Sequence, residues 1–174
     1  MNTSNKDKQM PGVGASAHVV NCFRAKHPEI SLDKFAHLWI SEPAVELANH
    51  YLEKVGETEA DAHCLRHRFF LESLRAFCKE TKEKVFINIG AGFTNYPHLI
   101  NANIPCCEVD KPNIINAKQR RLQELQASGQ IPKRDILFLP IDDIETSNAR
   151  NELFKLLTKW TNKRKSFVLM EGLI

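Results

Sequence analysis

Apolar residues recur at three- and four-residue steps through residues 15–82, which is the spacing of amphipathic helices. Ser41-Glu42-Pro43 is predicted to begin a helix, because serine caps helix starts, an acid favours the positive end of the helix dipole and proline is tolerated in the first turn. Gly56 is predicted to end this helix, and a second helix is predicted to begin at Thr58. The predicted apolar faces comprise Ala44, Leu47, Ala48, Tyr51, Leu52 and Val55 in the first helix and Ala62, Leu65, Phe69, Leu74 and Phe77 in the second.

From residue 83 onward the pattern changes to short apolar runs, several of them rich in β-branched residues, which are typical of buried strands. These runs alternate with helical stretches, and such alternation predicts an α/β fold with a parallel sheet covered by helices on both faces. The strands are expected in the order 3-2-1-4. The predicted strands are Val85–Ile89, Pro105–Val109, Ile136–Leu139 and Phe167–Met170, and the predicted helices between them are Asn95–Asn101, Pro112–Ala127 and Thr146–Trp160.

Composition narrows the class of protein. The 174 residues are 43% hydrophobic and 26% charged, which excludes a disordered or collagen-like chain. A net charge of +3 without a basic cluster argues against a nucleic-acid partner. The first ten residues lack the apolar core of a secretory signal, and no run is long enough to cross a bilayer. We therefore expect a cytoplasmic protein without a membrane partner.

The five cysteines are odd in number, form no C-x-x-C motif and include an adjacent pair, Cys106-Cys107. This arrangement suits neither a disulfide framework nor a zinc site. We expect buried, reduced thiols and no metal site.

A glycine-rich turn, Gly90-Ala91-Gly92, follows the first predicted strand. Glycine there lets the backbone approach a bound nucleotide closely, and a following helix would offer free N–H groups. A dinucleotide fingerprint would need a third glycine where this chain has Asn95, so pyrophosphate binding is disfavoured. A simple tight turn is the alternative.

Acidic residues follow the next predicted strands. Asp110 lies twenty residues after Gly90, where a carboxylate accepts the ribose hydroxyls of a nucleoside, whereas Glu108 is the lesser candidate by strand alternation. A solvated loop acid, or a cap for the helix beginning at Pro112, is the alternative for Asp110.

Two further acidic positions are candidates. Asp142-Asp143 follows the third predicted strand, where an acid can accept from the amine of an adenine or can instead begin a helix. Glu171 ends the fourth predicted strand, and the carboxyl ends of parallel strands face the ligand crevice. The alternative for Glu171 is an acid without a ligand.

Three blocks of this sequence resemble the leucine carboxyl methyltransferase family, whose members use S-adenosylmethionine. They are Ile87–Phe93, Cys107–Pro112 followed by Lys118, and Leu169–Gly172. Upstream, Trp39–Pro43 is similar to the family's aromatic–acid–proline segment, and Leu65–Arg68 is similar to its arginine-bearing helix. The resemblance implies a Rossmann-like class I methyltransferase fold preceded by a helical segment.

The resemblance also implies roles for individual residues. Arg66, with Arg68 as the alternative, would bind the methionine carboxylate of the cofactor. The turn Gly90-Ala91-Gly92 would line the methionine end, Asp110 would hold the ribose, Asp142 and Asp143 would flank the adenine, and Glu171 would lie near the amino group.

The sequence departs from the family pattern in two places. Thr94-Asn95-Tyr96 stands where members commonly have an Asp-Thr-Arg type of triplet, and the sequence stops soon after the fourth predicted strand, where members continue. We therefore expect a helical cap segment over residues 1–82 and a Rossmann-like S-adenosylmethionine-binding domain over 83–174, truncated after that strand.

The expected function is carboxyl or O-methyl transfer to a small-molecule or carboxylate acceptor, with no general base visible. Two alternatives stay open: an inactive remnant that binds an adenosyl ligand or a protein partner, and a nicotinamide-dependent enzyme, which Asn95 disfavours. Because Phe167–Met170 would form an apolar edge strand, we also expect a homo-oligomer with this strand or the helix before it at the interface.

Overall fold

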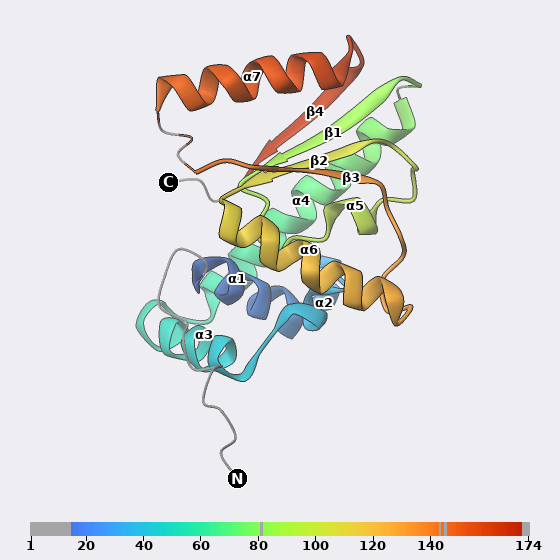
Figure 1. Cartoon of the computed structure of the whole chain (residues 1–174). Helices are drawn as coiled ribbons and strands as arrows, with labels where there is room; N and C mark the ends of the chain where they lie inside the picture. The colour runs from blue at the N-terminus through green and yellow to red at the C-terminus, as the bar shows by residue number, and fades with distance from the viewer. Residues whose placement is uncertain (1–14, 81, 143, 145, 172–174) are drawn as a thin grey trace. The chain divides into compact units, whose positions relative to one another are not determined.

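The computed structural model describes residues 15–80, 82–142, 144 and 146–171 (Figure 1). The chain forms two compact units, Met1–Arg68 and Phe69–Ile174. Helix α4 (Thr58–Glu80) begins in the first unit and ends in the second. The sequence analysis divides the chain at residues 82/83, where the helical pattern changes to a strand pattern. The structure divides it between Arg68 and Phe69 instead, because the parts on either side of that point are each compact.

The second unit is built on a four-stranded parallel sheet in the order β3-β2-β1-β4, as the sequence predicts. The α/β fold class and the Rossmann-like topology are therefore confirmed. The strands are β1 (Lys84–Ile89), β2 (Cys106–Asp110), β3 (Ile136–Pro140) and β4 (Lys165–Met170), and the helices that connect them are α5 (Tyr96–Leu99), α6 (Pro112–Ala127) and α7 (Ser147–Thr161).

Helices cover both faces of this sheet (Figure 1). On one face Leu153 of α7 packs into a cluster with alternate residues of the strands, such as Ile87 and Val109. On the other face Phe77 of α4 contacts Phe167 of β4, with ring centroids 5.6 Å apart. The alternation of side chains along each strand therefore supplies two apolar surfaces, as expected for a sheet covered on both sides.

Strand β4 lies at one edge of the described sheet and pairs with β1. Leu169 is buried, but Val168 and Met170 are 52% and 58% exposed. The apolar run that predicted a strand covered on both faces therefore has one open face. The expected self-association through this edge stays a prediction.

The first unit is a small helical assembly. Helix α3 begins after Ser41 and ends at Gly56, as predicted, and Gly56 has φ +92°, a backbone conformation that favours glycine. The elements are α1 (Ala15–Lys26), α2 (Pro28–Ser31), η1 (Ala36–Trp39), α3 (Glu42–Val55) and the start of α4, and the buried core comprises Val19, Cys22, Phe23, Ala44, Ala48, Leu52, Ala60 and Cys64.

The predicted apolar face of α4 is wrong over its first half. Leu65 and Phe69 are 56% and 65% exposed, although the periodicity placed them in the core. The buried stripe passes instead through Cys64, His67 and Leu71. The apolar pattern could not identify this stripe because one of its members is a histidine, whose imidazole has buried polar partners in the same unit.

The cysteines are free thiols, and four of the five are buried while Cys78 is half-buried. Burial raises the pKa of Cys64 to about 11 and the pKa values of Cys106 and Cys107 to about 12. These thiols are therefore protonated and inaccessible in the folded chain.

Iodoacetamide at about pH 8 should modify Cys78 first and leave Cys106 and Cys107 intact, because the thiolate is the nucleophile. Peptide mass spectrometry after timed alkylation measures this order. The same reaction in denaturant, where all five cysteines should react, is the control. Rapid modification of Cys106 or Cys107 in the folded chain would contradict the burial of these thiols.

Candidate functional site

The turn after β1 has a backbone that favours glycine. Gly90 and Gly92 have φ +72° and φ +46°, in the left-handed region that side chains with a Cβ disfavour. The two predicted glycines therefore define a sharp turn at the carboxyl end of β1. Both are part-exposed there, and Ala91 between them is buried.

The N–H groups of this turn bond to the end of β2. Gly90 and Ala91 donate to the carbonyl oxygen of Val109, at 2.8 and 3.1 Å, and Gly92 donates to Oδ2 of Asp110 at 2.7 Å. A phosphate-binding loop needs such N–H groups to face its ligand. The N–H groups of the turn itself are therefore bonded to β2.

N–H groups of the helix after the turn are also bonded within the chain. It is predicted over residues 95–101, but α5 is only four residues long, Tyr96–Leu99. The N–H groups of His98 and Leu99 bond to the carbonyl of Asn95. The turn and α5 therefore disfavour the dinucleotide-binding alternative and suit a ligand without phosphate.

Asp110 is the last residue of β2, and both of its carboxylate oxygens accept hydrogen bonds. Oδ2 accepts from Gly92 and Oδ1 accepts from the N–H of Lys111, each at 2.7 Å. Each carboxylate oxygen has two lone pairs, so each can accept one further hydrogen bond. The part-buried carboxylate thus fixes the glycine turn and retains the capacity to hold a pair of hydroxyl groups.

The end of β3 lies next to the end of β2. The N–H of Ile141 donates to the carbonyl of Asp110 at 2.9 Å, and the exposed Asp142 follows it. Its neighbour Asp143, the other predicted adenine contact, lies outside the described residues.

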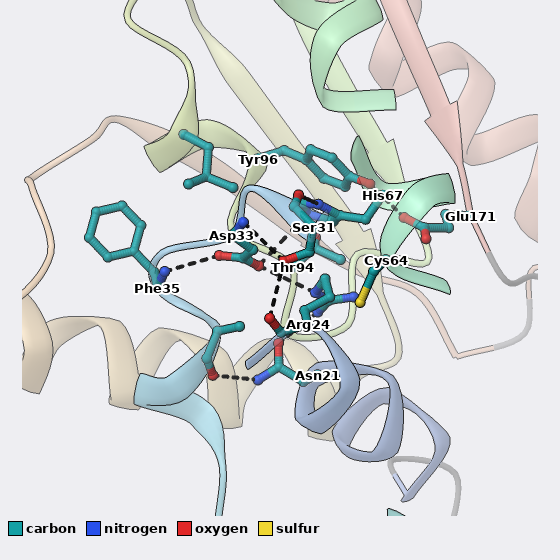
Figure 2. A network of polar contacts seen from close by, with 12 residues as sticks. Asn21, Arg24, Ser31, Asp33, Phe35, Cys64, His67, Thr94, Tyr96 and Glu171 are labelled. Carbon is teal, nitrogen blue, oxygen red and sulfur yellow. Dashed lines mark hydrogen bonds and ion pairs between the residues drawn. The ribbon is translucent and has the colours of Figure 1, made fainter. Parts of the chain in front are cut away.

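Glu171 lies at the end of β4, on the opposite side of the turn from Asp110 in the strand order. Its Oε2 accepts from the hydroxyl of Tyr96 at 2.7 Å (Figure 2). Because Met170 is in register with Ile89, Glu171 follows β4 at the level where Gly90 follows β1. The sequence identified Tyr96 only as part of the departing triplet.

A buried polar network lies behind the turn. The side-chain amide of Asn88 donates to Oγ1 of Thr94 at 2.9 Å, and that hydroxyl donates to the carbonyl of Ala91 at 2.8 Å. In the parallel register Asn88 pairs with Glu108 of β2. Asn88 of β1 thus holds the turn through the Thr94 hydroxyl.

Glu108 forms an ion pair with Lys118 of α6, with Oε2 and Nζ 2.7 Å apart and both side chains almost completely buried. Burial raises the pKa of Glu108, and the Lys118 ammonium opposes this rise. The sequence ranked Glu108 below Asp110 and missed the pair. The available signal was Lys118 itself, a lysine on the apolar stripe of α6 that includes Ile115 and Leu122.

The arginines assigned to the cofactor carboxylate lie in the first unit. Arg66 is exposed and its Nη2 lies 2.7 Å from Nδ1 of His63, and Arg68 is part-exposed. The buried arginine of this unit is Arg24, whose Nε lies 3.3 Å from Oδ2 of Asp33 (Figure 2). The sequence did not anticipate this second buried ion pair.

His67 completes the buried cluster of the first unit. Its Nδ1 lies 2.8 Å from the carbonyl oxygen of Ser31, and its Nε2 lies 3.7 Å from Oδ2 of Asp33. These contacts hold the end of α2 and the residue Asp33 that follows it against His67 of α4.

In the described part of the chain, no helix is long and apolar enough to span a membrane, and no group of His, Cys, Asp and Glu side chains is arranged to hold a metal ion.

Comparison with known proteins shows which family the sequence matches. The family model described as leucine carboxyl methyltransferase matches residues 13–174, which is nearly the whole chain. A search of curated proteins gives no match. The matched region includes the glycine turn, Asp110, Glu171 and the arginine-bearing helix. The chain therefore belongs to the leucine carboxyl methyltransferase family and, with it, to the methyltransferases.

Proposed function

We propose that the chain binds S-adenosylmethionine at the carboxyl ends of its strands and serves methyl transfer to an oxygen of a small-molecule or carboxylate acceptor. The observation that carries the proposal is the Asp110 carboxylate. It is fixed by Gly92 and Lys111 at the end of β2 and can still accept two hydroxyl groups.

The donor set of the second unit fits the chemistry of this cofactor. S-adenosylmethionine has a ribose, an ammonium and a carboxylate but no phosphate, which suits a glycine turn whose N–H groups bond to β2. Asp110 would accept the ribose hydroxyls, Glu171 the ammonium and Asp142 the amine of the adenine. The Gly90-Ala91-Gly92 turn would line the methionine end.

In the first unit Arg66 is our choice for the cofactor carboxylate, with Arg68 as the alternative. A guanidinium pairs with a carboxylate through two parallel hydrogen bonds, which a lysine cannot reproduce. Asp143 would flank the adenine with Asp142.

The transfer itself depends mainly on alignment. The bound cofactor supplies the methyl group on a sulfonium, and the protein has to hold the acceptor oxygen in line with it. A carboxylate acceptor is already ionised at neutral pH, so it needs no general base. Because no general base is visible in the sequence, a carboxylate is favoured over a neutral hydroxyl as the methyl acceptor.

Replacing Asp110 by alanine should weaken binding of S-adenosylhomocysteine by about 1–3 kcal/mol, because ribose hydroxyls would lose their acceptor. Adenosine, which keeps the ribose, should lose a similar amount. Isothermal titration calorimetry measures both affinities, and the exposed Asp135→Ala, also in the second unit, is the matched control.

Two outcomes would count against this assignment. A wild-type chain that binds neither ligand would contradict the proposed function. Unchanged affinities in Asp110→Ala would remove Asp110 from the site while leaving the binding of the cofactor in place. Because Asp110 also fixes Gly92, a melting curve of the variant should accompany the titration.

A further inference from the structure

We propose that Tyr96 is a positioning residue, which orients the Glu171 carboxylate toward the ammonium of the bound cofactor. The inference rests on the proposed function and adds to it a residue that contacts Glu171 rather than the cofactor. It follows from three observations in the second unit.

The first observation is the hydrogen bond itself. The Tyr96 hydroxyl donates to Oε2 of Glu171 at 2.7 Å, a short distance typical of a hydroxyl bonded to a charged carboxylate. This bond restricts rotation of the carboxylate. A carboxylate has about four acceptor positions, so one carboxylate can accept from a tyrosine hydroxyl and from an ammonium together.

The second observation is how firmly the phenol ring is held. Tyr96 is completely buried, and its ring meets Phe86 edge to face with centroids 6.1 Å apart. Phe86 in turn contacts Phe167, and Phe167 contacts Phe77, with centroids 6.2 and 5.6 Å apart. This row of rings joins α4, β1, β4 and α5, so the position of the hydroxyl is set by the core.

The third observation is the register of β1 and β4. Ile89 pairs with Met170, so the next residues, Gly90 and Glu171, leave the sheet at the same level. The carboxylate that Tyr96 orients is therefore beside the glycine turn, where the methionine end of the cofactor is proposed to lie. A hydrogen bond with a purely structural role would have no reason to distinguish ligands that carry the ammonium from those that lack it.

The test removes the hydroxyl and keeps the ring. Tyr96→Phe should lower the affinity for S-adenosylhomocysteine about tenfold, as expected for a lost hydrogen bond to a charged group. It should leave unchanged the affinity for 5′-methylthioadenosine, which has the adenine and ribose but no ammonium. The chain's other tyrosine, Tyr51, is exposed, and Tyr51→Phe is the matched control.

A second variant tests the same assignment by changing the carboxylate that Tyr96 contacts. Glu171→Gln should lose affinity for S-adenosylhomocysteine and keep affinity for 5′-methylthioadenosine. In that background Tyr96→Phe should cause little further loss, because the two side chains act together. If Tyr96→Phe does not fold, the ligand discrimination of Glu171→Gln alone decides.

The outcomes separate the two proposals. A wild-type chain that binds neither ligand overturns the proposed function and this inference with it. A wild-type chain that binds both, together with a Tyr96→Phe variant that keeps its affinity for S-adenosylhomocysteine, overturns the inference alone. Equal losses for the two ligands in Tyr96→Phe would assign the hydroxyl a structural role and overturn it as well.

Discussion

Replacing Lys118 by methionine is expected to destabilise the folded chain by about 3–5 kcal/mol, because the change leaves Glu108 buried without its counter-charge. The two side chains are almost completely buried and their charged atoms lie 2.7 Å apart. Methionine is close to lysine in length and fits the apolar stripe of α6, so the loss reports the missing charge rather than a cavity.

The loss should depend on pH in a defined direction. Burial raises the pKa of Glu108, and the Lys118 ammonium opposes the rise, so removing the ammonium raises this pKa further. A carboxyl whose pKa is higher in the folded than in the unfolded state binds its proton more tightly when folded. Stability therefore falls as pH rises through that interval. The variant should differ least from wild type in acid and most at alkaline pH.

Urea unfolding between about pH 5 and pH 8 measures this difference. The chain has two tryptophans, and a Trp39→Phe background leaves Trp160 of the second unit as the fluorescent reporter. The exposed Lys133→Met is the matched control and should be nearly neutral. The double variant Lys118→Met with Glu108→Gln should recover much of the loss. A loss below about 1 kcal/mol at neutral pH, or one that is independent of pH, would contradict a buried ion pair.

The sheet could be predicted from sequence because its signals are local. Runs such as Val85–Ile89 are apolar and rich in β-branched residues, and a parallel sheet of alternating strands and helices has few permitted strand orders. The glycine turn and Asp110 were found for the same reason. Each is recognised by its distance along the sequence from the end of a predicted strand.

The contacts between residues of the candidate site could not be predicted from distances along the sequence. Tyr96 and Glu171 are 75 residues apart, and only the parallel pairing of β1 and β4 brings them together. The use of the turn's N–H groups by Val109 and Asp110 is likewise a property of the folded backbone. Sequence spacing indicated which residues follow the ends of the strands but not which of them contact one another.

In the first unit, the burial of charged residues likewise could not be predicted from the sequence. Periodicity assigns polar residues to the solvent, yet Arg24, Asp33 and His67 are buried together, with Oδ2 of Asp33 3.3 Å from Nε of Arg24 and 3.7 Å from Nε2 of His67. Leu65 and Phe69, which periodicity places on the core face of α4, are exposed instead. A helix with a histidine on its buried stripe needs a polar partner from another element, which apolar spacing alone does not reveal.

Replacing Asp33 by alanine should cost about 3–5 kcal/mol, because Arg24 would be left buried without its carboxylate. The side chain has a second function, since its Oδ1 accepts from the N–H of Phe35 at 3.1 Å. Asp33→Asn separates the two: the amide oxygen can still accept from Phe35, but the charge that pairs with Arg24 is gone.

Urea unfolding of Asp33→Ala and Asp33→Asn, followed through Trp39 in a Trp160→Phe background, reports the first unit. The exposed Glu46→Gln on α3 is the matched control for loss of a negative charge. If the ion pair dominates, the asparagine variant should lose nearly as much as the alanine variant, and adding Arg24→Met to it should restore stability. If the asparagine variant is as stable as wild type while the alanine variant is not, the contact with Phe35 dominates. Burial of the charges would then contribute little to the stability of this unit.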